Sequence, residues 1–214
     1  MGYSKGEEIA NSITHGIGAA FSIAALVLMI VFAAINGNAW QVVSVSIYGA
    51  TLIILYVMST IYHAITNKKA KKVLQIIDHS SVYLLIAGTY TPFSLVVLRQ
   101  FTYKGWVVFG VVWAMAVLGI TFYAIFQKRF KILNIISYVI MGWIIVVAFP
   151  DLLNAMRSLN AINGIYWLLA GGICYTLGVL FYAQKKRKYF HTIWHVFVLL
   201  GSICHFISVF FYVI

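Results

Sequence analysis

Seven long apolar runs constrain the fold more than any other feature of this sequence. The hydrocarbon core of a bilayer is about 30 Å thick, and a helix needs roughly 20 apolar residues to cross it. The runs occupy residues 17–35, 42–65, 73–98, 106–126, 132–153, 162–182 and 192–214. The chain is 63% hydrophobic and only 9% charged, which excludes an ordinary soluble domain. We therefore expect an all-α integral membrane protein, a seven-transmembrane-helix bundle forming one domain over residues 1–214.

The basic residues predict how this bundle is oriented. The chain has 15 Lys and Arg residues against 4 acidic ones, a net charge of +11. Most of the basic residues fall in the second, fourth and sixth connectors: Lys68, Lys69, Lys71, Lys72, Lys128, Arg129, Lys131, Lys185, Lys186, Arg187 and Lys188. Basic connectors stay on the cytoplasmic side, so we expect the N-terminus inside and the C-terminus outside. This charge indicates topology and contacts with anionic lipids, and no nucleic-acid partner is expected.

Residues 1–16 precede the first run and are expected to form a cytoplasmic lead-in. Glu8, Asn11 and His15 recur there at spacings of three and four residues, beside Ile9 and Ile13. This pattern is typical of a short amphipathic helix at the membrane interface. An ordinary solvated segment accounts for it equally well.

Three histidines and one aspartate lie at a common depth near basic connectors. His191 and His195 stand one helical turn apart, three and seven positions past the sixth connector, and project from one helix face. His63 closes the second run, and Asp78 lies roughly 9 Å into the third at about 1.5 Å per residue. A charged residue such as Asp at the centre of a membrane helix costs about 2.5–3.5 kcal/mol, so these groups should find partners in one another.

Three imidazoles around a divalent cation, with a fourth position open, form the tetrahedral pattern of a catalytic zinc site. We therefore expect His63, His191 and His195 to bind Zn²⁺. Asp78 is either a direct ligand or holds the metal-bound water and acts as its general base. The alternative interpretation is a buried polar network that only joins helices.

Other polar side chains near this layer have supporting or structural roles in the hypothesis. Ser59 lies one turn before His63, and Tyr56 a further turn away, so either can hydrogen-bond the water or a polarised carbonyl. His79 points about 100° away from its neighbour Asp78 and is expected to support or pack. His205 lies some 15 Å beyond the histidine pair at about 1.5 Å per residue, so we expect a hydrogen-bonded interior residue.

Five short motifs, taken together, are specific enough to indicate a protein family. They are Glu8-x-x-Asn11-x-x-Thr14-His15, Ser59-x-x-x-His63, Asp78-His79, Gly88-Thr89-Tyr90-Thr91-Pro92 and His191-x-x-x-His195. With these motifs the chain resembles the hemolysin III family, the bacterial branch of the larger progestin and adipoQ receptor (PAQR) family that includes the adiponectin receptors. The resemblance implies seven helices with an internal N-terminus, in a bacterial plasma membrane. It also implies zinc held by three histidines, with a water-linked carboxylate and a nearby serine: His63, His191, His195, Asp78 and Ser59.

The functions that follow fall into three classes. By resemblance to eukaryotic relatives, the first is a zinc-dependent hydrolase of lipid amide (ceramide-like) or ester bonds, with membrane lipids as partners and substrates. The second is a pore-forming haemolysin or channel, although the sequence has no amphipathic strand or long polar-faced helix that could insert from a soluble form. The third is a membrane lipid homeostasis sensor with structural zinc. The sequence leaves the substrate and the oligomeric state open.

Overall fold

The computed structural model describes residues 3–184 and 187–214, and every regular element in this part of the chain is helical. Several of the helices follow one another without a connector, so that two of the long segments change helix type along their length. The elements are α1 (Lys5–Asn36), α2 (Ala39–Ala64), α3 (Lys68–Pro92), the π-helix η1 (Phe93–Leu98), α4 (Arg99–Phe101), α5 (Lys104–Phe126), the 3₁₀ helix η2 (Gln127–Phe130), α6 (Lys131–Trp143), the 3₁₀ helix η3 (Ile144–Ala148), α7 (Phe149–Ser158), α8 (Asn163–Ala183) and α9 (Phe190–Tyr212).

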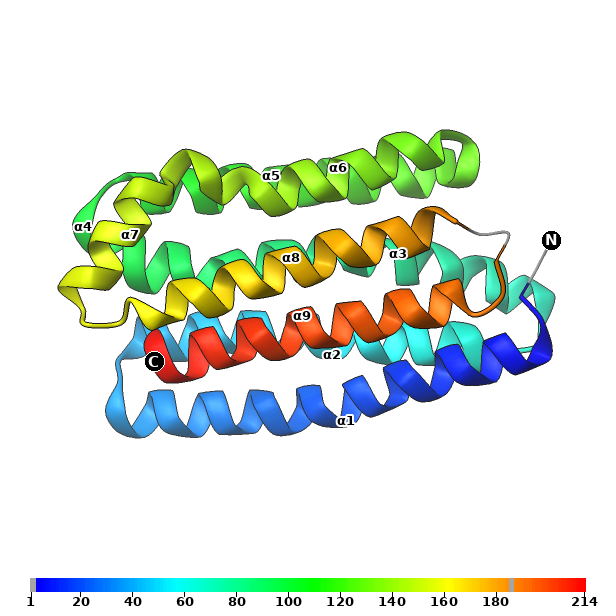
Figure 1. Ribbon diagram of the computed structural model, residues 1–214, viewed down its shortest axis with the longest axis horizontal. Coiled ribbons are helices and arrows are strands. Elements are labelled where there is room, and N and C mark those ends of the chain that lie inside the picture. Colours follow the sequence, from blue (N-terminus) through cyan, green and yellow to red (C-terminus); the bar gives the residue numbers. More distant parts are fainter. Residues whose placement is uncertain (1–2, 185–186) are drawn as a thin grey trace.

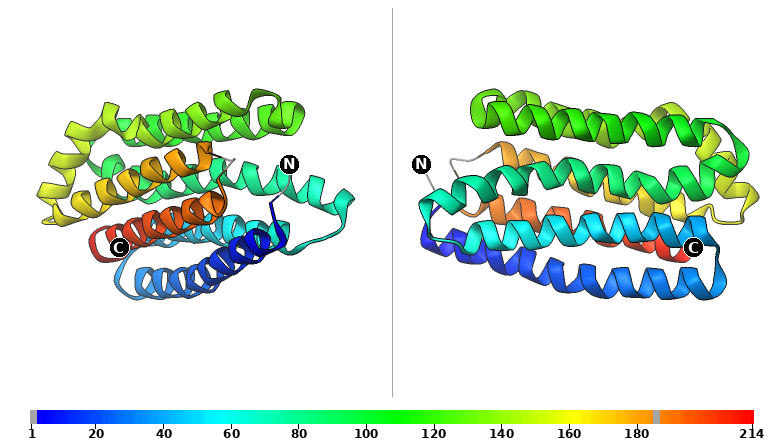
Figure 2. Two further views of the ribbon diagram at one scale, coloured as in Figure 1. Left: turned by 45° about the vertical axis from the view of Figure 1, so that its right-hand side comes forward. Right: turned by 180° about the vertical axis from the view of Figure 1, so that it is seen from behind.

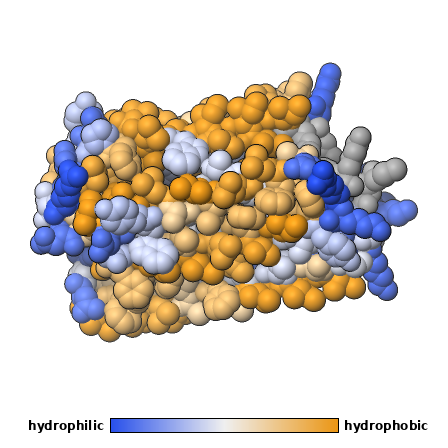
Figure 3. Space-filling view, viewed as in Figure 1, coloured by the Kyte–Doolittle hydropathy of each residue, from blue (hydrophilic) through white to orange (hydrophobic). Residues whose placement is uncertain are grey.

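Within the described residues, seven helical segments are long and apolar enough to cross a membrane. They confirm the expected all-α, seven-helix fold. Five of them are single helices, while α3 continues through η1 and α4, and the fifth segment joins α6, η3 and α7. On the face seen in Figure 3, a broad apolar band separates two hydrophilic ends. This surface is that of a multi-pass membrane protein.

The helices run antiparallel along the long axis of the molecule, and α3 is the central one. In the most apolar window of the α3 segment 83% of the residues are buried, against 22% in α1 and in α5. α1 lies at one edge beside α2 and α9, and α5 and α6 lie at the opposite edge (Figure 1, Figure 2). The core is therefore formed around α3, α2 and α9.

The two ends of the bundle differ in charge. The N-terminus lies at the same end as the α2–α3, α5–α6 and α8–α9 connectors, and the C-terminus lies at the other end (Figure 1). These three connectors are the ones that carry most of the basic residues in the sequence. Two of those residues, Lys185 and Lys186, lie outside the described residues. Because basic connectors stay on the cytoplasmic side, we expect this end of the bundle, with the N-terminus, to lie in the cytoplasm. The orientation in the membrane stays a prediction.

The lead-in differs from the expected separate helix. Residues 5–16 are the first turns of the 32-residue helix α1, which continues into the first apolar run. Ser4 caps this helix, because its hydroxyl accepts from the backbone N–H of Glu7 while the Glu7 carboxylate accepts from the backbone N–H of Ser4. Asn11 and His15 are buried against the bundle, so the polar stripe faces neighbouring helices.

The Gly88 to Pro92 motif shapes the centre of α3. A Cβ atom at Gly88 would overlap with the side chain of Thr51 in α2, so glycine permits the close contact of these two helices. Pro92 ends α3, and the chain continues as the π-helix η1. Because proline has no N–H, the helix cannot keep its regular hydrogen bonds there.

Candidate metal centre

His191 and His195 lie at the start of α9, where the backbone turns sharply into the helix. Tyr189 precedes the helix with φ of 61°, a left-handed conformation that is uncommon for a residue with a side chain. Its N–H donates to Oε1 of Glu7, so the start of α9 is tied to the start of α1. The Nε2 atoms of His191 and His195 are 3.1 Å apart. Both imidazoles are therefore presented at one point inside the bundle.

His63 at the end of α2 completes the cluster. One ring nitrogen from each of the three buried histidines lies within 4.8 Å of the other two. Nε2 of His63 is buried and has no hydrogen-bond partner among residues 3–184 and 187–214. In a tetrahedral zinc site, bonds of about 2.0–2.1 Å separate two nitrogens by roughly 3.3 Å. The spacing of His191 and His195 fits this value, and the three histidines can hold a metal ion.

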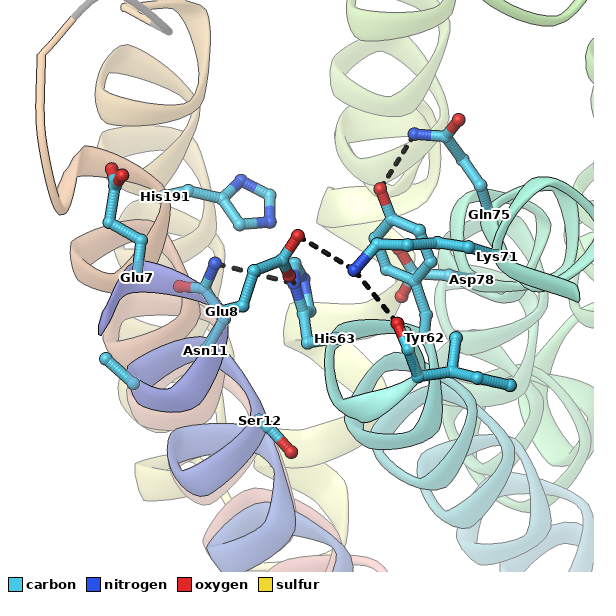
Figure 4. A network of polar contacts seen from close by, with 12 residues as sticks. Glu7, Glu8, Asn11, Ser12, Tyr62, His63, Lys71, Gln75, Asp78 and His191 are labelled. Carbon is cyan, nitrogen blue, oxygen red and sulfur yellow. Dashed lines mark hydrogen bonds and ion pairs between the residues drawn. The ribbon is translucent and has the colours of Figure 1, made fainter. Parts of the chain in front are cut away.

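The first turns of α1 contact the outer nitrogens of two of these rings, that is, the Nδ1 atoms of His63 and His195. Oε2 of Glu8 lies 2.6 Å from Nδ1 of His63, and the backbone oxygen of Asn11 lies 3.2 Å from Nδ1 of His195. The second carboxylate oxygen of Glu8 lies 2.8 Å from Nζ of Lys71 (Figure 4). Glu8 thus connects α1 to both α2 and α3 at the edge of the cluster.

Tyr3 covers the cluster from the N-terminal end of the bundle. Its ring stacks on His191 with centroids 4.7 Å apart and lies 5.9 Å from the ring of His63. Burial raises the pKa of the Tyr3 hydroxyl well above its ordinary value, and the charges of Asp78 and Glu8 add to this effect. Burial therefore favours the neutral, protonated hydroxyl at the edge of the cluster.

Asp78 and Ser59 lie near the three histidines, but they are not among the side chains whose ligand atoms lie within 4.8 Å of one another. Asp78 is buried, and its Oδ2 lies 3.2 Å from Nδ1 of His79. Asp78 also interacts with His63 through its charge and with the hydroxyl group of Ser59. That hydroxyl oxygen is buried, and no group in the part of the chain that the structure describes meets full hydrogen-bond geometry with it. An additional small polar group would satisfy it.

The expectations for His79 and His205 agree with the structure, whereas the hydroxyl group of Tyr56 is already hydrogen-bonded elsewhere. His79 stacks on Tyr123 at 5.1 Å, as a supporting or packing residue would. Nε2 of His205 donates to the backbone oxygen of Leu168 at 3.1 Å. The hydroxyl of Tyr56 donates to Oγ of Ser202 at 2.7 Å, so that hydrogen is already used.

A cavity of about 130 Å³ begins beside Asp78 and extends into the bundle. It is enclosed mainly by α3, α6, α8 and α9, and most of its lining is apolar. Val82 and Ile86 line it on α3, and Val139 lines it on α6. A carboxylate therefore lies at one end of a space that suits a hydrocarbon chain.

Comparison with known sequences identifies the family. The profile of the family described as haemolysin-III related matches residues 3–206. The chain belongs to this family. It is similar to the hemolysin-3 homolog of Bacillus subtilis (strain 168), with 47% identity over 206 residues that cover 96% of this chain and 94% of the relative. Hemolysin-3 of Bacillus cereus is 45% identical over 208 residues, which cover 97% and 92% of the two chains.

The haemolysin III family is in turn related to the progestin and adipoQ receptor family. The monocyte to macrophage differentiation factor of Homo sapiens is 27% identical over 213 residues, covering 95% of this chain and 83% of the human protein. The expected resemblance is confirmed at this level. The bacterial relatives indicate the plasma membrane as the location of this haemolysin III family protein.

Sequence reasoning missed the contribution of α1 to the site. His15 stacks on His195 with ring centroids 3.4 Å apart and planes 14° apart, and both His15 nitrogens lack a hydrogen-bond partner within the described residues. Glu8 and Asn11 contact two of the histidines directly. The available signal was the regular spacing of Glu8, Asn11 and His15, which an interfacial helix explains as well as a buried face does.

Proposed function

We propose that this haemolysin III family protein is a zinc-dependent hydrolase that cleaves the amide bond of ceramide-like lipids or the ester bond of other membrane lipids. The observation that carries the proposal is a group of three histidines near a buried carboxylate, Asp78, which itself lines one end of an apolar cavity. The two parts together fit a substrate with a polar head and a long apolar chain.

Three side chains, His63, His191 and His195, would hold the ion. A Zn²⁺ ion bound by three histidines polarises a carbonyl group and lowers the pKa of a water molecule at its open position. The local charge favours a cation, because Glu8 and Asp78 both interact with His63. Imidazole ligands suit zinc better than they suit Mg²⁺ or Ca²⁺.

Asp78 is the proposed general base. Its carboxylate accepts a proton from the attacking water as the oxygen of that water bonds to the carbonyl carbon. When the carbon–nitrogen bond of an amide breaks, Asp78 returns the proton to the leaving amine; for an ester it returns the proton to the leaving alcohol. His79, 3.2 Å from Oδ2, holds this carboxylate in place. The Ser59 hydroxyl donates a hydrogen bond to the substrate carbonyl oxygen.

The cavity is proposed to take an acyl chain of the lipid. Its apolar lining on α3, α6, α8 and α9 removes the chain from water and places the head beside Asp78. Lipid reaches it laterally between helices, so the substrate never leaves the membrane.

The test is hydrolysis by full-length protein in liposomes that contain a panel of lipid amides and esters. Released fatty acid, sphingoid base or lysolipid is measured by mass spectrometry. We expect turnover of at least one lipid class with wild type, and none with a variant that carries both His191→Ala and His195→Ala. Equal product formation by the two proteins would contradict the proposal.

A second candidate function is a pore, which is favoured by the name hemolysin-3 of the two Bacillus relatives. In this case the inserted bundle, alone or as an oligomer, conducts ions across the membrane. Release of a trapped dye or ion from liposomes separates the two functions. Flux that persists in the His191→Ala, His195→Ala variant, without lipid hydrolysis by wild type, would favour the pore.

A further inference from the structure

The nearest neighbour of Nδ1 in two candidate ligands is a group that can only accept a hydrogen bond. The Thr14 hydroxyl also lies 3.3 Å from Nδ1 of His195, but it donates its hydrogen to the backbone oxygens of Ala10 and Asn11. Oε2 of Glu8 is 2.6 Å from Nδ1 of His63, and the backbone oxygen of Asn11 is 3.2 Å from Nδ1 of His195. Ionised carboxylates and backbone carbonyls carry no hydrogen to donate. Each Nδ1 must therefore be the donor, which leaves the lone pair of a neutral ring on Nε2, the atom that faces the cluster.

Lys71 fixes the geometry of Glu8. Nζ of Lys71 lies 2.8 Å from Oε1 of Glu8 and also donates to the backbone oxygen of Ile65 at 3.4 Å (Figure 4). Both oxygens of the half-buried Glu8 carboxylate are thus used, one by a permanent donor on α3 and the other by His63 on α2. A neutral side chain with one acceptor oxygen could not serve both.

A second contact at Nδ1 of His63 opposes the first. Nδ2 of Asn11 lies 3.5 Å from this nitrogen, and an amide N–H can only donate to it. The amide cannot turn over freely, because its Oδ1 accepts from the hydroxyl of Thr192 at 2.6 Å. Without Glu8, the remaining neighbour of Nδ1 would be this donor, and the His63 proton would move to Nε2. That tautomer has no lone pair for a metal.

We propose that Glu8 is a positioning residue that holds His63 as the Nδ1–H tautomer and so sets the affinity of the three-histidine site for metal, with Lys71 as the residue that aligns it. The inference rests on the metal site of the proposed function and is independent of whether lipid is hydrolysed. Carboxylates that accept from ligand histidines typically change metal affinity by about 10- to 100-fold.

The test compares the Zn²⁺ affinity of the detergent-purified full chain in wild type, Glu8→Gln and Asp151→Asn, by competition with a chelator of known affinity. In Glu8→Gln, Lys71 donates to the amide oxygen and the NH₂ group faces His63, so we expect Zn²⁺ to bind about 10- to 100-fold more weakly. Asp151 is the control carboxylate, because it pairs with Lys104 at the other end of the bundle. Asp151→Asn should leave the affinity unchanged.

Two further measurements separate positioning from a merely structural ion pair. Adding Lys71→Met to Glu8→Gln frees the amide oxygen to accept from His63, so part of the Zn²⁺ affinity should return. If Glu8 and Lys71 only held the helices together, the second substitution would not restore the affinity. In metal-free wild type, ¹⁵N NMR of labelled histidines should show His63 protonated on Nδ1. An Nε2–H tautomer there would overturn the inference even if Glu8→Gln failed to fold.

The remaining outcomes are also decisive. Equal Zn²⁺ affinity of wild type and folded Glu8→Gln would overturn the role of Glu8 while leaving the metal site intact. A wild-type chain that binds no Zn²⁺ would overturn both this inference and the proposed function. Tight Zn²⁺ binding with the expected variant effects, but no lipid hydrolysis, would count against the proposed function alone.

Discussion

The Nε2 atoms of His191 and His195 face each other at 3.1 Å, although both side chains come from the same helix. Nδ1 of His195 lies 3.2 Å from the backbone oxygen of Asn11, which can only accept a hydrogen bond, so in the neutral ring Nε2 carries the lone pair and can accept a hydrogen bond or bind a cation. Without a cation, one neutral ring must donate to the other. With a cation, both lone pairs and that of His63 converge on it.

Zinc should stabilise the folded protein. A ligand at 100 times its dissociation constant contributes about 2.7 kcal/mol when it binds only the folded state. Adding Zn²⁺ to metal-free protein in detergent should therefore raise the thermal midpoint of unfolding. Mg²⁺, which prefers oxygen ligands, should not raise it. An equal response to both ions would argue that the effect is unspecific.

Asp78→Asn should separate catalysis from metal binding. The amide keeps the size of the side chain but cannot accept the proton of the attacking water, so turnover should fall by about 10²- to 10⁴-fold. Zinc content and thermal stability should stay close to wild type. Asp151→Asn is the matched control, since Asp151 pairs with Lys104 at the other end of the bundle. Undiminished hydrolysis by Asp78→Asn would remove Asp78 from the mechanism.

Gly88→Ala should destabilise the bundle where α2 and α3 meet. The added methyl group would overlap with Thr51, and overpacking of this kind costs about 1–3 kcal/mol. Gly110→Ala on α5 is the matched control, because a Cβ atom there would meet no atom within 4 Å. That change should be neutral or stabilising, since alanine favours helix by about 1 kcal/mol over glycine. Similar thermal midpoints for the two variants would contradict the packing seen around α3.

The orientation of the bundle is testable with fusion reporters. The charge distribution predicts a cytoplasmic N-terminus and an external C-terminus. Alkaline phosphatase, which is active only outside the cytoplasm, should be active when fused after Ile214 and inactive when fused in the α2–α3 connector. The reverse pattern would place the metal centre at the external face.

The sequence alone predicts the number of helices and the depth of the candidate ligands, because both depend on distance along a helix axis. The apolar runs set the spans, and counting from basic connectors brings His63, His191 and His195 to one layer. These three histidines do lie together. The same counting separates His205, which bonds to Leu168 instead.

The contacts of α1 could not be predicted in the same way. They depend on how each helix is rotated about its axis and on which helices are neighbours, and neither is encoded in local spacing. Glu8 and His63 are 55 positions apart in the chain, and Asn11 and His195 are 184 apart. The polar stripe on α1 was visible, but whether it faced solvent or the bundle depended on this packing.

The most direct test of the metal centre is the zinc content of purified protein, measured by elemental analysis without chelators. We compare wild type, the double variant His191→Ala with His195→Ala, and His205→Ala as a control for loss of a buried histidine from α9. The account predicts near one zinc per chain in wild type and in His205→Ala, and none in the double variant. Well-folded wild type without metal, or a double variant that keeps its zinc, would contradict it.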